Sequence, residues 1–227
     1  MKRKVTKKPT ARLREGAAEK KARAKVIVKR LRKAYPGAQT SLTFRNPFEL
    51  LVATILSAQC TDERVNQVTP ALFNRYPTAD DMAGAKAEEL EAMIRSTGFF
   101  RNKTKSLLGM SNALVERHGG AVPAKMEDLV DLPGVGRKTA NVVLGNAFGK
   151  NIGVVVDTHV ARLSGRLGLT AETDAVRIEQ DLVQLIPRKD WTLLPHLFID
   201  HGRAVCKAPT PKCEICVLSD LCPSSRV

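Results

Sequence analysis

Four of the five cysteines fall within one segment of 17 residues. Four thiolates at this density can bind a zinc ion or a [4Fe–4S] cluster. Disulfides are the less favoured alternative, because they are typical of secreted proteins and the N-terminus does not resemble a signal peptide. Structural zinc sites usually contain two C-x2-C pairs, and only one is present here. The spacing C-x6-C-x2-C-x5-C therefore favours a structural [4Fe–4S] cluster over zinc, with these ligands: Cys206, Cys213, Cys216 and Cys222.

Residues 126–148 combine two short helical patterns with the turn Leu-Pro-Gly-Val-Gly between them. Gly134 and Gly136 flank Val135, so the backbone can turn tightly and expose its N–H groups. These groups and the following helix N-terminus predict an anion site that suits a DNA phosphate. A plain turn between two packed helices is the alternative interpretation.

Lys138 lies in the first turn of the second helix, where the helix dipole disfavours a cation. Partial burial and the adjacent charge of Arg137 would act in the same direction and favour a neutral amine. A neutral lysine amine is a nucleophile. The alternative is a lysine that only contacts phosphate.

Asp157 stands where an apolar run passes into a predicted helix. An Asp at such a junction is commonly an N-cap. It could also be a carboxylate beside Lys138 that moves a proton and stabilises positive charge on a sugar. The spacing does not prove that residues 138 and 157 meet, but a helix followed by an extended return allows it.

The remaining pattern is that of a helical protein. About ten helical segments are separated by Gly and Pro, and residues 152–156 alone could form a short strand or an extended connector. Beyond residue 58 the helical segments are expected near 62–75, 87–96, 101–118, 125–131, 137–148, 158–167, 174–186 and 190–201. Asn46 and the Pro that follows it indicate a helix start before the apolar run 48–58. We therefore predict an all-α fold.

The charge distribution points to a polyanionic partner. The formal net charge is +14, of which residues 1–25 contribute +9. Residues 1–19 read as a disordered basic tail that could contact DNA or only solvent. No apolar stretch is long enough to span a membrane, so we expect an intracellular protein, cytoplasmic or nucleoid-associated if prokaryotic. Single-site DNA binding requires only a monomer.

Taken together, the motifs closely resemble the endonuclease III family. They are Leu-Pro-Gly-Val-Gly-Arg-Lys-Thr-Ala at 132–140, Val-Asp-Thr-His at 156–159 and the cysteine spacing. Ser-Ala-Gln-Cys-Thr-Asp at 57–62 and Gly-Phe-Phe-Arg-Asn-Lys at 98–103 are also similar to motifs of that family.

The resemblance implies the helix-hairpin-helix DNA glycosylase fold. A six-helix barrel domain would span residues 40–150, with the helix-hairpin-helix at 126–148. Residues 20–39 and 151–227 would form the iron–sulfur cluster domain. Duplex DNA with damaged bases or abasic sites would be the partner.

The resemblance also implies roles for individual residues. Lys138 would be the nucleophile, and Asp157 the catalytic carboxylate that converges with it. Gln59 would fill the gap left by a flipped nucleotide, and Phe99 would be the wedge opposite, where a leucine is commoner. The hairpin residues named above would grip the DNA backbone. Asp62 and His159 would lie near the substrate pocket, although they could instead be a helix cap and a structural histidine. Apart from the resemblance, Lys207 and Lys212 lie in the loop between the first two cysteines, where they could face DNA phosphates or only solvent.

The expected activity is a base-excision-repair glycosylase that removes oxidised pyrimidines, with abasic-site lyase activity. A non-catalytic DNA-binding module with a metal cluster would explain the charge, hairpin and cysteines, but not Lys138 together with Asp157. An adenine mismatch glycosylase would lack the lysine at position 138. A metal-dependent endonuclease would need clustered acids near the DNA, and the sequence shows none.

Overall fold

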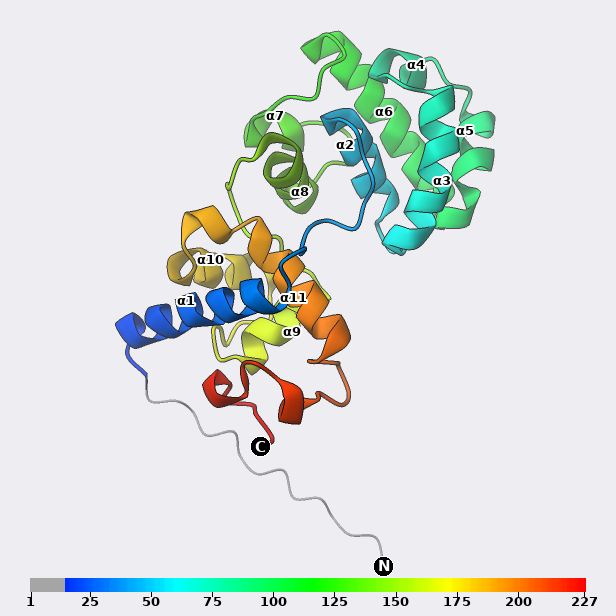
Figure 1. Ribbon diagram of the computed structural model, residues 1–227. Coiled ribbons are helices and arrows are strands. Elements are labelled where there is room, and N and C mark those ends of the chain that lie inside the picture. The colour runs from blue at the N-terminus through cyan, green and yellow to red at the C-terminus, as the bar shows by residue number, and fades with distance from the viewer. Residues whose placement is uncertain (1–14) are drawn as a thin grey trace, which may run out of the picture. The chain divides into compact units, whose positions relative to one another are not determined.

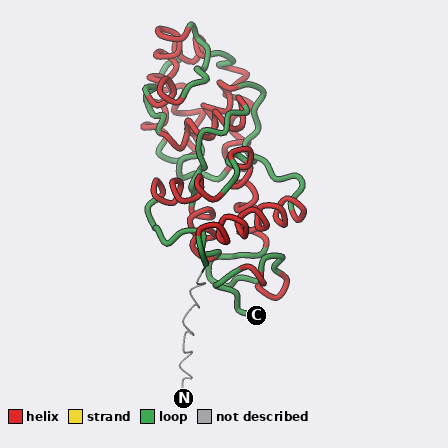
Figure 2. Tube along the Cα trace, turned by 90° about the vertical axis from the view of Figure 1, so that its left-hand side faces the viewer, coloured by secondary structure: helices red, strands yellow, loops and turns green. Residues whose placement is uncertain are grey.

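The computed structural model describes residues 15–227, and these are helical throughout with loops between (Figures 1 and 2). The described residues contain no strand, which confirms the all-α prediction. Residues 152–156 are a connector without regular structure. None of the described helices is long and apolar enough to cross a membrane.

The chain divides into two compact units, of which Thr40–Ile152 is one. Its core is a single cluster of buried side chains that includes Leu50, Leu72, Met110 and Leu144. In Figure 1 this unit runs from blue to green, and α8 lies beside α2 and α7. Its helices are α2 (Pro47–Leu56), α3 (Asp62–Arg75), α4 (Ala79–Ala83), α5 (Ala87–Ile94), η1 (Arg95–Thr97), α6 (Phe100–His118), α7 (Met126–Val130) and α8 (Arg137–Phe148).

The cap predicted at Asn46 forms as the sequence indicates. Its side-chain oxygen accepts a hydrogen bond from the backbone N–H of Glu49 at 2.9 Å, and Pro47 is the first helical residue. The helix that follows is almost wholly buried because nearly all of its residues are apolar. Glu49 is buried too, and its carboxylate accepts from Arg45 Nε at 2.7 Å.

The other unit is discontinuous in sequence. It joins the described residues up to Gln39 to Gly153–Val227. Its own apolar core includes Ile27, Leu31, Leu163 and Phe198. The elements are α1 (Ala17–Ala34), α9 (Thr158–Arg166), α10 (Ala175–Leu185), η2 (Arg188–Asp190), α11 (Leu193–Ala204), η3 (Cys213–Ile215) and η4 (Ser219–Leu221).

The expected disordered tail over residues 1–19 extends too far. Residues 1–14 lie outside the described residues, but α1 begins at Ala17. The N–H of Gly16 donates to the Glu19 carboxylate at 2.9 Å, and Glu15 forms an ion pair with Arg23 at 2.8 Å. These contacts hold residues 15–19 in place. The prediction of a longer tail relied on the density of basic residues, which does not indicate such contacts.

Candidate functional site

The hairpin between α7 and α8 is a tight turn closed by its own backbone. The N–H of Val135 donates to the carbonyl of Leu132 at 3.1 Å, and both side chains are buried. Gly134 has φ +76°, and a Cβ added there would lie 2.5 Å from Ser106 Cβ. Only glycine therefore fits at position 134. The Val135 N–H that was expected to face DNA is already engaged, so it does not contribute to an anion site, whereas the first turn of α8 still offers N–H groups.

Lys138 is the second residue of α8 and is exposed. The expectation of partial burial is wrong, because the buried face of the helix begins two residues later, at Ala140 and Asn141. The amine of Lys138 is therefore open to solvent at the start of α8.

Gln59 and Phe99 occupy the tips of two loops in the same unit. Among the described residues, they are the two non-glycine residues with positive φ, at 53° and 48°. Both side chains are exposed, and 61% of the Phe99 surface is accessible. Together with Gly134 and Thr139 they line an open groove of about 310 Å³. An exposed aromatic beside an exposed amide suits insertion into a base stack.

Lys103 lines the same groove and was not identified from the sequence as a functional residue. It is 5% exposed, and its ammonium donates to two backbone carbonyls, those of Leu56 and Thr97. The sequence did hold a signal, because Lys103 falls on the helical stripe formed by Leu107 and Met110, where an apolar residue is expected.

Asp157 is the N-cap of α9. Its carboxylate accepts from the N–H of Val160 at 2.7 Å, and the residue is half-buried. His159 is the second residue of this helix, and its Nδ1 accepts a hydrogen bond from Arg162 Nη2 at 3.1 Å. Burial lowers the pKa of His159, Asp157 opposes this shift, and Arg162 and Arg203 add to it. The cap interpretation of Asp157 is thus correct, and it leaves the second carboxylate oxygen for other partners.

Asp62 lies in the other unit and is not the helix cap that the sequence offered as its alternative role. Thr61 caps α3 instead, by accepting from the N–H of Arg64 at 3.3 Å. Asp62 is the first residue of the helix and is half-buried. Cys60, the cysteine outside the cluster, is partly buried against the core of that unit.

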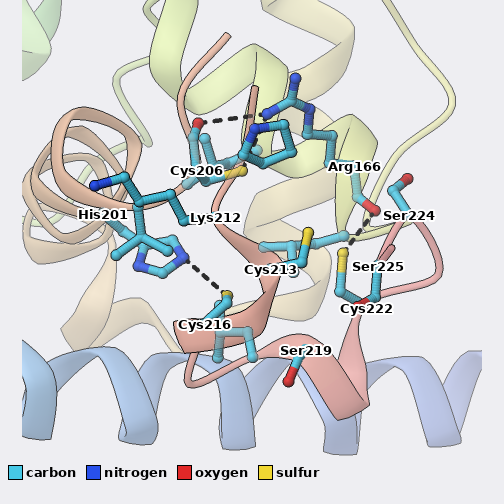
Figure 3. A pocket seen from close by; sticks show the side chains of 15 residues that line it. Arg166, His201, Cys206, Lys212, Cys213, Cys216, Ser219, Cys222, Ser224 and Ser225 are labelled. Carbon is cyan, nitrogen blue, oxygen red and sulfur yellow. Dashed lines mark hydrogen bonds between the residues drawn. The ribbon is translucent and has the colours of Figure 1, made fainter. Parts of the chain in front are cut away.

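The four cysteines expected to bind a cluster line one pocket (Figure 3). The pocket is formed by α9, α11 and the loops around η3 and η4, and Cys216 lies near His201, with His201 Nε2 3.4 Å from Cys216 Sγ. Arg166 donates from Nη1 to Cys206 Sγ at 3.2 Å and to the carbonyl of Lys207 at 2.8 Å. Lys207 and Lys212 are exposed on the loop between the first two cysteines.

The donor set of this pocket fits a cationic sulfur-ligated group. Burial raises the pKa of the Cys216 and Cys222 thiols, and charge on the neighbouring cysteines raises it further. Bound iron would offset both effects by stabilising the thiolates. Within the described residues, no three His, Cys, Asp or Glu side chains are placed to share a single metal ion. A cubane differs in this respect, since each of its four irons takes one thiolate.

Comparison with known proteins agrees with this fold and these motifs. Residues 52–188 match the family model described as HhH-GPD superfamily base excision DNA repair protein. The chain is 58% identical to endonuclease III of Synechocystis sp. over 209 residues, which is 92% of this chain and 95% of that protein. It is 47% identical to endonuclease III of Bacillus subtilis, covering 83% and 86% of the two chains.

Solved structures of endonuclease III are also similar to this protein. A trapped endonuclease III–DNA covalent intermediate superposes with a TM-score of 0.84 at 43% identity, over 90% of this chain and 96% of that one. The fold and the match define a base-excision-repair protein of the helix-hairpin-helix superfamily. Within it, the chain belongs to the endonuclease III family. It is a bifunctional DNA glycosylase and abasic-site lyase, as the sequence predicted.

Proposed function

We propose that the protein removes oxidised pyrimidines from duplex DNA and cleaves the resulting abasic site through Lys138. The observation that carries this proposal is the position of Lys138: an exposed amine in the first turn of α8, directly after the hairpin. The relative solved as a covalent intermediate with DNA supports it, because a covalent bond to DNA requires a nucleophile on the protein.

The target base must leave the stack before an enzyme can reach its sugar, at a cost of roughly a few kcal/mol. Gln59 would occupy the gap and Phe99 would wedge against the opposite base. Both are exposed at one groove, which supports this pairing of roles. The N–H groups of Gly136 and of the first turn of α8 would hold the DNA backbone, with Gly134 and Val135 shaping the turn and Arg137, Lys207 and Lys212 adding charge.

In the chemical step, Lys138 Nζ bonds to C1′ of the deoxyribose as the bond from C1′ to the base breaks and the base leaves protonated. The sugar ring opens to an imine, which acidifies the C2′ proton. Loss of that proton expels the 3′ phosphate and cuts the strand. Asp157 would stabilise positive charge on the sugar and transfer protons. Asp62 and His159 would contact the extruded nucleotide.

We propose further that Cys206, Cys213, Cys216 and Cys222 bind a [4Fe–4S] cluster. With all four corners held by thiolates, the group would supply structural cross-linking of the loops that carry it, with no open coordination site. The family relationship and the shared pocket support this assignment over zinc.

The oligomeric state and the cellular location are inferred from the interaction with duplex DNA. We infer that the protein acts as a monomer on duplex DNA, in the bacterial cytoplasm or nucleoid, as its bacterial relatives indicate. The DNA-bound relatives support the interaction with a duplex. Sedimentation of the protein with and without a lesion duplex would measure the stoichiometry.

Borohydride trapping on a duplex with one abasic site tests the central proposal. Wild-type protein and a Lys150→Gln control should form a covalent adduct, because Lys150 is an exposed lysine just beyond the end of α8. Lys138→Gln should bind the duplex but give no adduct. Trapping by Lys138→Gln at the wild-type rate would contradict the role of Lys138. If the folded wild type neither trapped nor cleaved, a non-catalytic DNA-binding module would be the better interpretation.

A further inference from the structure

One buried ammonium joins the two loops that carry Gln59 and Phe99. Lys103 projects from the first turn of α6, and its Nζ donates to the carbonyl of Leu56 and to that of Thr97, each at 2.8 Å. The residue is 5% exposed. Burial lowers its pKa, and an ammonium in this position needs acceptors such as these two carbonyls.

Both acceptors are the last residues of helices. Leu56 ends α2 and Thr97 ends η1, where carbonyls lack a partner one turn later in the helix. A cation at a helix C-terminus is also favoured by the helix dipole. Lys103 therefore satisfies two chain ends at once.

The segments beyond these two chain ends are the functional loops. Gln59 follows Leu56 by three residues, and Phe99 follows Thr97 by two. Each has a left-handed backbone, which is unfavourable for a side chain and persists only when the flanking structure enforces it. The Lys103 ammonium holds the chain three residues before Gln59 and two residues before Phe99.

We propose that Lys103 is a positioning residue for DNA recognition: its ammonium fixes the separation of Gln59 and Phe99, so that both side chains enter the base stack together. The proposal rests on the roles given to these two residues in the proposed function. Lys103 itself touches neither base nor sugar in this scheme. All three residues line the same groove.

The first experiment measures the loops without DNA. Lys103→Met keeps the length of the side chain and removes both hydrogen bonds. Lys150→Met is the matched control, because Lys150 Nζ also donates to one backbone carbonyl in this unit, that of Ala124 at 2.7 Å. Amide hydrogen exchange at residues 57–60 and 98–100 should accelerate about tenfold or more in Lys103→Met alone. Unchanged exchange in both loops would overturn the proposal.

The second experiment is a double-mutant cycle on binding to a duplex with a non-cleavable abasic analogue. Lys103→Met and the Gln59→Ala, Phe99→Ala double variant should each lower the preference for the analogue over intact duplex by about tenfold. Combining them should cost little more than the double variant alone, because Lys103 acts through those two side chains. Full additivity would mean that Lys103 acts only on general stability, and the proposal would be wrong.

A further variant covers the case in which Lys103→Met is poorly folded. Lys103→Gln keeps one donor and should give an intermediate preference for the analogue, whereas a wild-type preference would contradict the proposal. The measurements distinguish a failure of the gap-filling roles of Gln59 and Phe99 from a failure of the positioning role of Lys103. If Gln59→Ala, Phe99→Ala keeps full preference for the analogue, the proposed gap-filling roles fail. If that variant loses preference and Lys103→Met does not, the positioning role alone fails.

Discussion

The carboxylate of Asp157 accepts a hydrogen bond from the backbone N–H of Val160, at 2.7 Å. The residue proposed to act in catalysis is therefore also the cap of α9. The two roles require different properties of the side chain. A cap needs an oxygen acceptor, whereas proton transfer and stabilisation of a cationic sugar need the negative charge.

Substitution can separate these roles. Asp157→Asn should unfold within a few tenths of a kcal/mol of wild type, because Asn caps as well as Asp, yet its glycosylase rate should fall at least about a hundredfold. Asp157→Ala should in addition lose about 1 kcal/mol of stability. Thermal unfolding and single-turnover base release measure the two effects. Asp174→Asn, at the cap of α10, is the control and should retain full activity.

The hairpin glycines differ in what they tolerate. Gly134→Ala should destabilise the protein by about 2–4 kcal/mol, because it combines a positive φ with a Cβ placed 2.5 Å from Ser106 Cβ. Gly136→Ala should change stability by less than about 1 kcal/mol, since φ is −93° and no atom lies within 4 Å of the added Cβ. Chemical denaturation measures both. Equal losses would show that the turn does not need this backbone geometry.

Arg166 should control how firmly the cluster is held. It donates to Cys206 Sγ and to the carbonyl of Lys207, so it fixes the loop that carries one of the proposed ligands. Arg166→Met should raise the rate of iron release to a chelator roughly tenfold, as loss of supporting contacts commonly does. Arg177→Met, at an exposed position in the same unit, is the control. Visible absorbance and iron analysis report the loss, and equal rates would argue against this support.

His159 should make the protein less stable as the pH falls. Its pKa is lowered in the folded protein by burial, so the unfolded chain binds a proton first as the pH drops through 6.5. Stability therefore decreases from about pH 7.5 downward, until the pH falls below the folded pKa of this residue. His159→Gln should reduce that dependence. Unfolding curves between pH 7.5 and 5.5 test this, and identical slopes for the two proteins would contradict it.

Local chemistry explains why some elements could be predicted. Asn46 and Pro47 mark a helix start through contacts within four residues, and the helices expected near 137–148 and 62–75 form there. The short helix α4 was missed, although Thr78 and Asp81 form its capping box. The segment near 190–201 is interrupted after Asp190, and α11 begins at Leu193.

In the candidate site, too, the features formed by neighbouring residues could be predicted, whereas contacts between residues far apart in the sequence could not. The cysteine spacing and the hairpin string are local patterns, and they led to the family. The exposure of Lys138 depends on which face of α8 packs inward, and Arg166 reaches its partners some 40 residues away. Lys103 donates to the carbonyl of Leu56, which lies 47 positions earlier in the chain. A sequence window cannot contain such contacts.

The discontinuous unit has a consequence for synthesis on the ribosome. The apolar face of α1 packs against residues that emerge more than a hundred positions later, and Arg23 donates to the carbonyls of Leu167 and Leu221. Thr40–Ile152 is contiguous and can fold as it appears, whereas α1 must wait with its apolar face in water. The nascent chain thus carries α1 without its packing partners until α10 and α11 have been synthesised, which exposes an apolar helix face during translation.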